Sequence, residues 1–132
     1  MCKRRDIILV DQYKSHGNEI GRHSFVVIDD TGDSIQGLPY DIVCNVLSSF
    51  KSESQKRQKL SYPGNFPITA TDVLVPSGNT KAGYIKTDQL YFFKKDLISY
   101  RIIGEMTEES FDELVAFIEN SDLDLEIITD NL

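Results

Sequence analysis

The sequence predicts a mainly β domain, a small and strongly bent antiparallel barrel or sandwich with a helix near its C-terminus. Short apolar runs separated by turn residues recur through residues 5–103, which is the pattern of strands in small all-β domains. Residues 107–119 have instead the spacing of an amphipathic helix. Runs of strands followed by a helix favour antiparallel pairing over a parallel α/β fold. We expect residues 1–132 to form one domain with its own core.

Composition narrows the class of protein. The chain is 40% hydrophobic and 27% charged, as is usual for globular proteins. Its apolar runs are too short to cross a bilayer or to form a signal peptide, so we expect no membrane contact. Cys2 and Cys44 cannot form a disulfide framework, and they fit a reducing compartment. A cytoplasmic location is therefore predicted.

The charges are divided unevenly along the chain. Residues 1–101 contain all 14 Lys and Arg and 11 of the 21 Asp and Glu, whereas residues 102–132 contain the other 10 acids and no base. The net charge is therefore +3 in the first segment and −10 in the second. This difference suggests that residues 1–101 are compatible with binding of a polyanion. The acidic segment 119–132 could lie over a basic groove, or it could complete the barrel, and an acidic surface could also serve only solubility.

The first third of the chain predicts a long hairpin. Residues 5–12 form a strand around an apolar centre, and residues 22–29 return as a second strand. Between them, residues 13–21 are predicted to be a loop with a mobile tip, because of their Gly and Asn content. Residues 31–39, with two glycines and a proline, are predicted to be another loop.

The middle of the chain alternates between strand and polar signals. Residues 40–47 predict a third strand that Ser48 and Ser49 end. Residues 51–59 have no apolar side chain and carry four bases against one acid, which indicates a solvated connector or a short exposed helix. Prolines and a glycine limit residues 62–67 to turns and edge structure.

The last third predicts several short strands and the helix. Strands are expected at the apolar stretches 71–75, 84–93, 100–103 and 122–128, with a loop over residues 76–83. In the helix Thr107 is a good N-cap, and the apolar positions fall at helical spacing on one face, at Phe111, Leu114, Val115 and Ile118.

Several familiar kinds of functional site are excluded, because the sequence lacks residues that they require. Residues 78–83 have the outer glycines of a phosphate-binding P-loop but lack the Lys and Ser/Thr that must follow. Two histidines and two separated cysteines do not supply the ligands of a zinc site, so neither a metal nor a cofactor is predicted. No nucleophile elbow supports a Ser-His-Asp triad.

Polar side chains at predicted strand ends remain as candidates: His16, Arg22, His23, Ser48 and Ser49. An arginine next to a hydroxyl suits phosphate chemistry, because its guanidinium holds two phosphate oxygens at once. RNA supplies its own nucleophile, the 2′-hydroxyl, so such a site would need no metal. Each of these residues could equally be an ordinary surface or turn residue.

Four segments, taken in order, resemble the MazF/PemK family of toxins. Residues 3–30 are similar to the family's first strand, glycine-containing loop and second strand. Residues 45–49 are similar to its strand end with a Leu-Thr-Ser sequence, residues 83–106 to its later strands, and residues 107–119 to its terminal helix. The resemblance covers most of the chain. His23 departs from the family pattern, which has a proline after the arginine.

The resemblance implies an SH3-like barrel of the CcdB/PemK type, usually a homodimer, that acts as a metal-independent endoribonuclease. Such toxins, called mRNA interferases, cut single-stranded RNA, and a cognate antitoxin protein occludes them. The family's catalytic arginine matches Arg22 and its catalytic threonine matches Ser48. The loop Lys14–Gly21 would cover bound RNA, with His16 as a candidate acid or base.

The remaining predicted RNA contacts are basic or polar residues that could hold phosphates: Lys14, His23, Ser49, Lys51, Lys56 and Arg57. Two alternatives remain. A degenerate, non-catalytic barrel could act through a protein partner, as the related gyrase-poisoning toxins do. A regulatory RNA-binding barrel could instead use the basic stretch at Lys51, Lys56, Arg57 and Lys59 without cutting.

Overall fold

The computed structural model describes residues 1–74 and 82–132, so residues 76–81 of the predicted loop 76–83, with most of its P-loop-like segment, lie outside the described residues. The helices are α1 (Glu53–Leu60) and α2 (Glu108–Glu119), with short 3-10 helices at Ala70–Asp72 and Lys95–Leu97. The strands of the described chain are β1 (Asp6–Val10), β2 (Tyr13–Ser15), β3 (Asn18–Ile20), β4 (His23–Asp29), β5 (Asp33–Ile35), β6 (Leu38–Tyr40), β7 (Ile42–Ser49), β8 (Asn65–Ile68), β9 (Val73–Leu74), β10 (Gly83–Lys86), β11 (Gln89–Phe93), β12 (Tyr100–Met106) and β13 (Glu126–Ile128).

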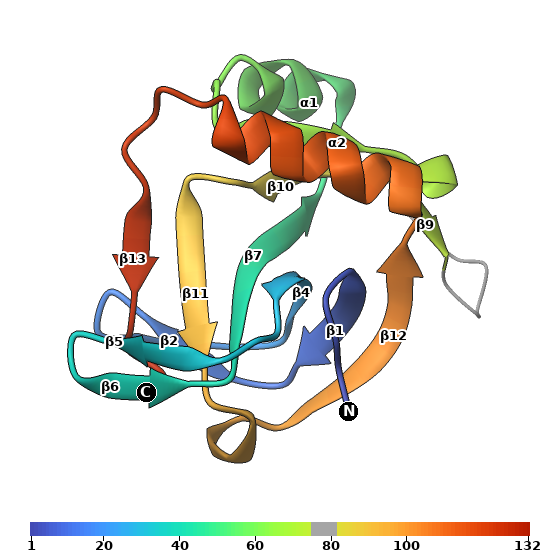
Figure 1. The fold of residues 1–132 in the computed structure, drawn as a ribbon. Helices are drawn as coiled ribbons and strands as arrows, with labels where there is room; N and C mark the ends of the chain where they lie inside the picture. The colour runs from blue at the N-terminus through green and yellow to red at the C-terminus, as the bar shows by residue number, and fades with distance from the viewer. Residues whose placement is uncertain (75–81) are drawn as a thin grey trace.

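Most strands belong to one strongly curved sheet (Figure 1). Its described strands run in the order β13, β11, β7, β4, β1, β12, β9, and β10 joins β7 to β8. Every pair is antiparallel except β13, which lies parallel to β11. The mainly β fold with antiparallel sheets and a C-terminal helix is therefore confirmed. No described helix is long and apolar enough to cross a membrane.

The predicted pairing of the first and second strands is confirmed. β1 and β4 are antiparallel, with Ile7 opposite Val26 and Val10 opposite His23. β-branched residues predominate in the apolar centre of both β1 and β4, and β4 also contains Phe25, as is usual for buried sheet strands. The following strand, β7, pairs with the other side of β4, so β4 lies at the centre of the sheet.

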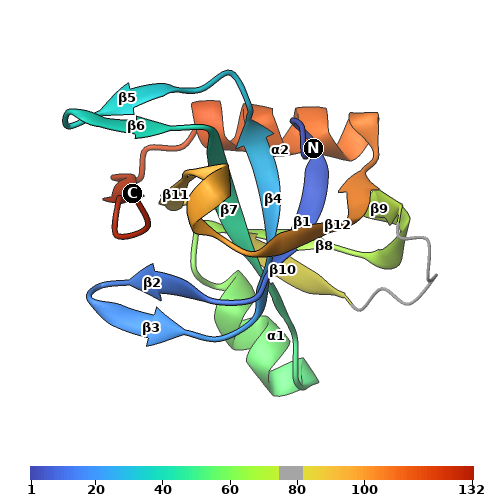
Figure 2. The ribbon, with the colours of Figure 1, turned by 90° about the horizontal axis from the view of Figure 1, so that it is seen from below.

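The predictions of loops at residues 13–21 and 31–39 are wrong. Each segment forms a small two-stranded hairpin of its own, β2–β3 and β5–β6. Figure 2 shows that the two hairpins project from the same side of the molecule, with the C-terminus between them. The turn residues have positive φ at both positions, 53° and 78° at His16–Gly17 and 52° and 78° at Gln36–Gly37. This is the geometry of type I′ turns, which connect tightly paired strands.

The end of β7 also differs from its prediction. The strand does not stop before the serines but includes them as its last two residues, because both pair with β10, Ser48 opposite Tyr84 and Ser49 opposite Gly83. A Cβ at Gly83 would overlap the carbonyl oxygen of Ser48. Glycine is therefore required there for β10 to pack this closely on the end of β7.

Two apolar clusters lie on the two faces of the curved sheet. Aromatic rings dominate the first cluster, where Phe25 is 5.0 Å from Tyr13 and 5.1 Å from Phe93 in edge-to-face contacts. The second cluster lies under α2, whose Phe111 and Leu114 pack on Ile7 and Val26. The helix predicted at residues 107–119 is thus confirmed, with its apolar stripe facing the sheet and Thr107 as N-cap.

The connector at residues 51–59 contains the short exposed helix α1. Ser52 caps it by accepting a hydrogen bond of 3.0 Å from the backbone nitrogen of Gln55, and none of its residues is buried. The chain that follows α1 fixes its position, because the side chain of Asn65 donates a hydrogen bond of 2.8 Å to the carbonyl oxygen of Lys59. α1 is therefore a basic, solvated element held at the edge of the fold.

The acidic C-terminal segment completes the sheet. Of the predicted strand 122–128 only β13 forms, and it extends the sheet edge beside β11. Ile128 is 3% exposed and belongs to the aromatic cluster, and the backbone nitrogen of Glu126 donates to the carbonyl oxygen of Asp88 at 2.7 Å. The segment is thus held by backbone pairing and by a buried side chain.

Candidate nucleic-acid groove

An open groove lies where the start of β4, the ends of β1 and β7, and α1 meet. Its volume is about 830 Å³. The antiparallel register explains its position: Ser24 at the start of β4 pairs with Leu9 on one side and with Leu47 near the end of β7 on the other. Arg22 precedes β4, so the sheet brings it to the same edge as the two serines that end β7.

Five of the predicted site residues line this groove, Arg22, His23, Ser48, Ser49 and Lys51. The strand register places the two serines on opposite faces of β7, because side chains alternate along a strand. Ser49 shares the face of Leu47, which pairs with Ser24, while Ser48 lies opposite Tyr84. Both nevertheless contribute to the groove wall.

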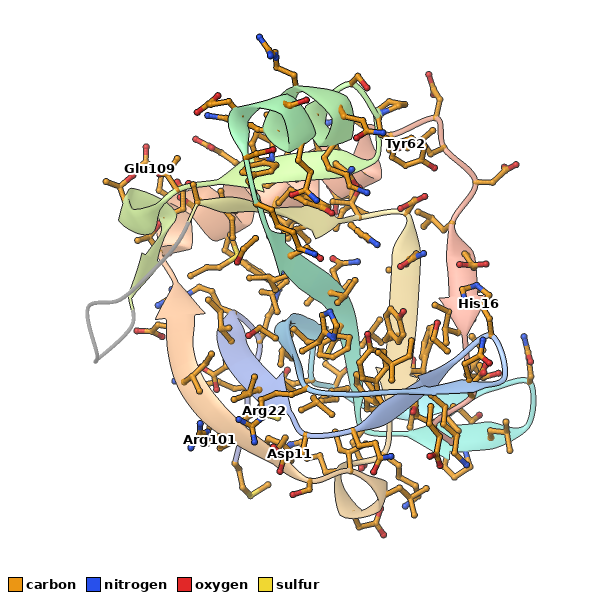
Figure 3. All side chains as sticks on the ribbon, turned by 180° about the vertical axis from the view of Figure 1, so that it is seen from behind. Asp11, His16, Arg22, Tyr62, Arg101 and Glu109 are labelled. Carbon is orange, nitrogen blue, oxygen red and sulfur yellow. The ribbon has the colours of Figure 1, made fainter. Side chains whose placement is uncertain are left out.

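The charged lining of the groove is basic. Arg22, Lys51 and Lys59 line it, and no Asp or Glu does so among the described residues. Arg22 is 65% exposed, and its Nε lies 3.5 Å from Asp11 Oδ1, the two side chains lying together in Figure 3. An exposed pair of this length is weak, so the guanidinium can exchange Asp11 for a phosphate. The groove is therefore suited to a polyanion.

An aromatic pair forms another part of the wall. The rings of Phe50 and Tyr84 are stacked, with centroids 5.3 Å apart and planes at 29°. Lys56 on α1 has its Nζ 6.0 Å from the centre of the Phe50 ring. Aromatic faces next to cations are the usual elements of a single-strand binding surface, because bases stack on the rings while phosphates meet the cations.

His23 is held by two contacts at the groove. Its Nδ1 lies 3.3 Å from the carbonyl oxygen of Gly21, and its ring meets Tyr13 edge-on at 5.8 Å. Burial raises the pKa of Tyr13 to about 12, so this neighbour stays neutral. The imidazole is thus fixed beside Arg22 in the position where the family has a proline.

His16 lies apart from the groove. Figure 3 shows it next to β13, well separated from Arg22. Its Nε2 is 2.8 Å from Glu126 Oε2, and its Nδ1 is 2.9 Å from Ser15 Oγ. The hydrogen bond to Glu126 and the charge of that carboxylate raise the pKa of His16 above its usual 6.5. Both ring nitrogens therefore have partners far from Arg22.

Ser15, His16 and Glu126 are linked by hydrogen bonds in series, as are the nucleophile, base and acid of a catalytic triad. However, Ser15 is only 2% exposed, and its hydroxyl also lies 3.1 Å from the buried hydroxyl of Tyr91. A substrate cannot reach a hydroxyl enclosed in this way. The three residues form a structural link between β2, β11 and β13.

The other predicted RNA contacts are spread around the groove. Lys56 reaches it through Phe50, whereas Arg57 lies on α1 outside the lining. Lys14 lies on hairpin β2–β3, and its backbone nitrogen donates a hydrogen bond to Asn131 Oδ1 at 2.7 Å. The structure thus groups Arg22, His23 and the serines, and leaves Lys14 and His16 on the hairpin.

Several residues that line this groove were not predicted from the sequence. Tyr84, Phe50 and Gln55 line the groove, and nothing in their sequence neighbourhood distinguishes them from ordinary strand or helix residues. Arg101 does not line the groove, but its strand partner Leu9 does, so Arg101 lies on the same side of the sheet as the groove.

Comparison with known proteins connects this geometry to a family. No curated protein matches the chain significantly. The family model described as "PemK-like, MazF-like toxin of type II toxin-antitoxin system" matches residues 3–121, nine-tenths of the 132 residues. The matched range includes Arg22, both serines and α2, and it ends before β13. The chain therefore belongs to the PemK-like, MazF-like toxins of type II toxin–antitoxin systems.

Proposed function

We propose that this toxin is an endoribonuclease that binds single-stranded RNA in the groove and cuts it without a metal ion. Toxins of this family are typically endoribonucleases. The observation that supports the same activity here is the meeting of Arg22 with two hydroxyls in a groove whose charged lining is basic. A guanidinium and a hydroxyl can stabilise the charge that develops on a phosphodiester during cleavage, and an adjacent aromatic ring can hold an unpaired base.

The proposed reaction uses the 2′-hydroxyl of RNA as the nucleophile. Its oxygen attacks the adjacent phosphorus while its proton passes to a base, the bond from phosphorus to the 5′-oxygen breaks, and that oxygen takes up a proton. The products are a 2′,3′-cyclic phosphate and a 5′-hydroxyl. Arg22 stabilises the two negative oxygens of the pentavalent intermediate, and the Ser48 hydroxyl donates a hydrogen bond to one of them.

The remaining groove residues hold the strand. Lys51 and Lys59 contact phosphates on either side of the scissile bond, with Ser49 and His23 as further donors. Lys56 and Arg57 on α1, and Lys14 on the hairpin, extend the positive surface. Phe50 offers a ring face on which an unpaired base can stack, and the buried ring of Tyr84 supports it from the other side. Double-stranded RNA would not fit, because its bases are not available for stacking.

A type II toxin has a cognate antitoxin protein as its partner. We propose that this antitoxin covers the basic groove, since a bound protein there excludes RNA. We also propose that the toxin forms a homodimer, as the family resemblance implies. Sedimentation of the toxin alone and with its antitoxin tests both statements.

The test of the activity is incubation of the purified toxin with a labelled single-stranded RNA in the presence of a chelator. The control is a strand of the same base sequence that carries 2′-deoxyribose at every position. The proposal predicts fragments that end in a cyclic phosphate from the first substrate and none from the second. Cleavage of the all-deoxy strand, or cleavage that requires an added metal ion, would contradict the proposed mechanism.

A second candidate is an RNA-binding protein that does not cut. It is favoured by the departure at His23 and by the same basic and aromatic lining, which would bind RNA without any catalytic group. A strand that is retained by the toxin but stays intact after long incubation would support this candidate over the nuclease.

A further inference from the structure

Hairpin β2–β3 is separated from the main sheet. Its two strands pair only with each other, through Tyr13–Ile20, Lys14–Glu19 and Ser15–Asn18. An isolated two-stranded hairpin is marginally stable in water, so other contacts must hold this one in place. The buried Tyr13 ring and the bond from Ser15 to Tyr91 hold its first arm.

The tip of the hairpin is held by residues 126–131, which we call the C-terminal strap. Asn131 uses both ends of its amide on Lys14: Oδ1 accepts from the backbone nitrogen at 2.7 Å, and Nδ2 donates to the carbonyl oxygen at 2.9 Å. These are the two bonds that a neighbouring strand would make. Asp130 Oδ2 accepts from the backbone nitrogen of Gly17 at 2.8 Å.

A third contact joins the turn to the strap. His16 Nε2 lies 2.8 Å from Glu126 Oε2, which is on β13. The strap itself is fixed, because β13 pairs with β11 and Ile128 is buried. All three contacts link residues more than 100 positions apart, and the residues that make them on the strap lie beyond the range matched by the family model.

The hairpin leads directly to the groove. Its second arm ends at Ile20, and only Gly21 separates that residue from Arg22. Its first arm begins two residues after Asp11, the carboxylate that pairs with Arg22. Among the described residues, no heavy atom lies within 4 Å of the place of a Cβ at Gly21, so the connection has little packing of its own. The backbone of Arg22 is therefore held from two sides, by the hairpin before it and by His23 after it, which pairs with Val10.

We propose that Asn131, Asp130 and Glu126 are positioning residues: the C-terminal strap holds hairpin β2–β3 and thereby holds Arg22 at the groove. The first part of this proposal, that the strap holds the hairpin, is supported by the hydrogen bonds alone. Its effect on RNA rests on the proposed function. None of the strap residues is among the described residues that line the groove, so we expect the strap to act through the hairpin.

One of the three contacts depends on pH. The titratable and charged groups around His16 are Glu126 and Asp130 on the strap, Tyr91 on β11 through Ser15, and Lys14 and Glu19 on the hairpin. The carboxylates favour the protonated ring, and the pKa of His16 is raised. The contribution of this pair is therefore complete below pH 6.5 and is lost as pH rises through the raised value. The contacts of Asn131 do not titrate.

The test compares two Asn→Asp substitutions. Asn131→Asp keeps the shape of the side chain but replaces the donor that faces the carbonyl oxygen of Lys14 by an acceptor. Asn18→Asp makes the same change on the exposed face of the hairpin, where the side chain has no hydrogen bond to a described residue. We measure amide hydrogen exchange of both variants and of the wild-type protein by mass spectrometry, at one pH.

Asn131→Asp is expected to raise exchange across β2–β3 by roughly tenfold, the size expected when one hydrogen bond is lost and the carbonyl oxygen of Lys14 is left without its donor. Exchange in β1, β4 and β7 should stay at the wild-type rate, and Asn18→Asp should leave the hairpin unchanged. Equal exchange of the hairpin in all three proteins would overturn the strap. Faster exchange throughout the variant would also overturn it, because the role of Asn131 would then be general stability.

The effect on RNA is measured separately on the same proteins. Asn131→Asp is expected to weaken binding of an uncleavable 2′-deoxy-substituted strand, with Asn18→Asp as the control for added negative charge. A loosened hairpin with unchanged affinity would overturn the link to Arg22. If the wild-type protein neither binds nor cuts RNA, the proposed function fails, while the exchange experiment still decides whether the strap holds the hairpin.

Discussion

Hairpins β2–β3 and β5–β6 have the same backbone plan, with three residue pairs each and a two-residue turn that ends in glycine. Their surroundings differ. Tyr13 and Ser15 of the first hairpin are buried, and four hydrogen bonds join its tip to the C-terminal strap. No residue of β5 or β6 is buried, and the hydrogen bonds of their side chains stay within the hairpin.

The two hairpins also lead to different kinds of residue. After β2–β3 the chain reaches Arg22, which faces the groove and has only a weak ion pair. After β5–β6 it reaches Asp41, whose carboxylate accepts a hydrogen bond of 2.7 Å from the backbone nitrogen of Lys95. The hairpin that precedes a groove residue is the one that is fastened, which indicates that its position matters for the site.

The largest expected effect separates these two residues. Arg22→Ala should lower RNA cleavage by on the order of 10²- to 10³-fold, because one preorganised donor to the intermediate is lost, and should leave the melting temperature nearly unchanged. Asp41→Ala should do the reverse, costing about 1.5–3 kcal/mol of stability with the rate per folded molecule kept. Cleavage assays and thermal unfolding of both variants measure this. An active Arg22→Ala protein would refute the site assignment.

A smaller effect concerns the end of β7. Ser48→Ala should slow cleavage by about tenfold, the size of one lost hydrogen bond to a charged group, and Ser49→Ala should slow it less. The two serines lie on opposite faces of the strand, so the comparison tests the register of the proposed hydroxyl. A larger loss in Ser49→Ala would move the catalytic role to Ser49, which shares the face of Leu47.

The tip of the fastened hairpin should titrate abnormally. The pKa of His16, followed by NMR, should lie above 6.5 in the wild-type protein and should fall in Glu126→Gln, because the main cause of the shift is the hydrogen bond to that carboxylate and then its charge. Asp124→Gln, which is exposed and has no hydrogen bond to a described residue, is the control. An unchanged His16 pKa in Glu126→Gln would show that this contact is absent in solution.

The smallest effect compares the two turns. Alanine at a glycine with φ of 78° costs about 1 kcal/mol of backbone strain. Gly17→Ala should lower the free energy of unfolding by about that amount, since the fastened hairpin cannot relax without losing the strap. Gly37→Ala should cost less, because the unfastened hairpin can fray alone. Equal losses in denaturant unfolding would indicate that both hairpins are equally coupled to the fold.

Local patterns in the sequence were enough for the central strands and for α2. The β-branched runs of β1 and β4 and the apolar stripe of α2 determine their own conformations, and Thr107 marks the helix start as expected. The two hairpins could not be predicted in the same way. His-Gly and Gln-Gly are not the usual residues of a type I′ turn, so the local sequence does not indicate these turns.

The residues of the candidate site were likewise only partly predictable from local sequence patterns. Arg22 and the serines stand out through their place at strand ends and through the family resemblance, but the partner of His16 is 110 residues away in the chain. Tyr84 reaches the groove only through the pairing of β10 with β7, which alternation alone does not specify. The acidic end of the chain gave no local sign that it would fasten a hairpin rather than cover a groove.

A double-mutant cycle tests most directly whether the strap and the groove act as one unit. The affinity for an uncleavable single strand is measured for the wild-type protein, Asn131→Asp, Arg22→Ala and the double variant. The account predicts that Asn131→Asp weakens binding by about threefold or more in the wild-type background and has almost no effect once Arg22 is gone. The same loss in both backgrounds would contradict it, because the strap would then act on RNA by a route that does not include Arg22.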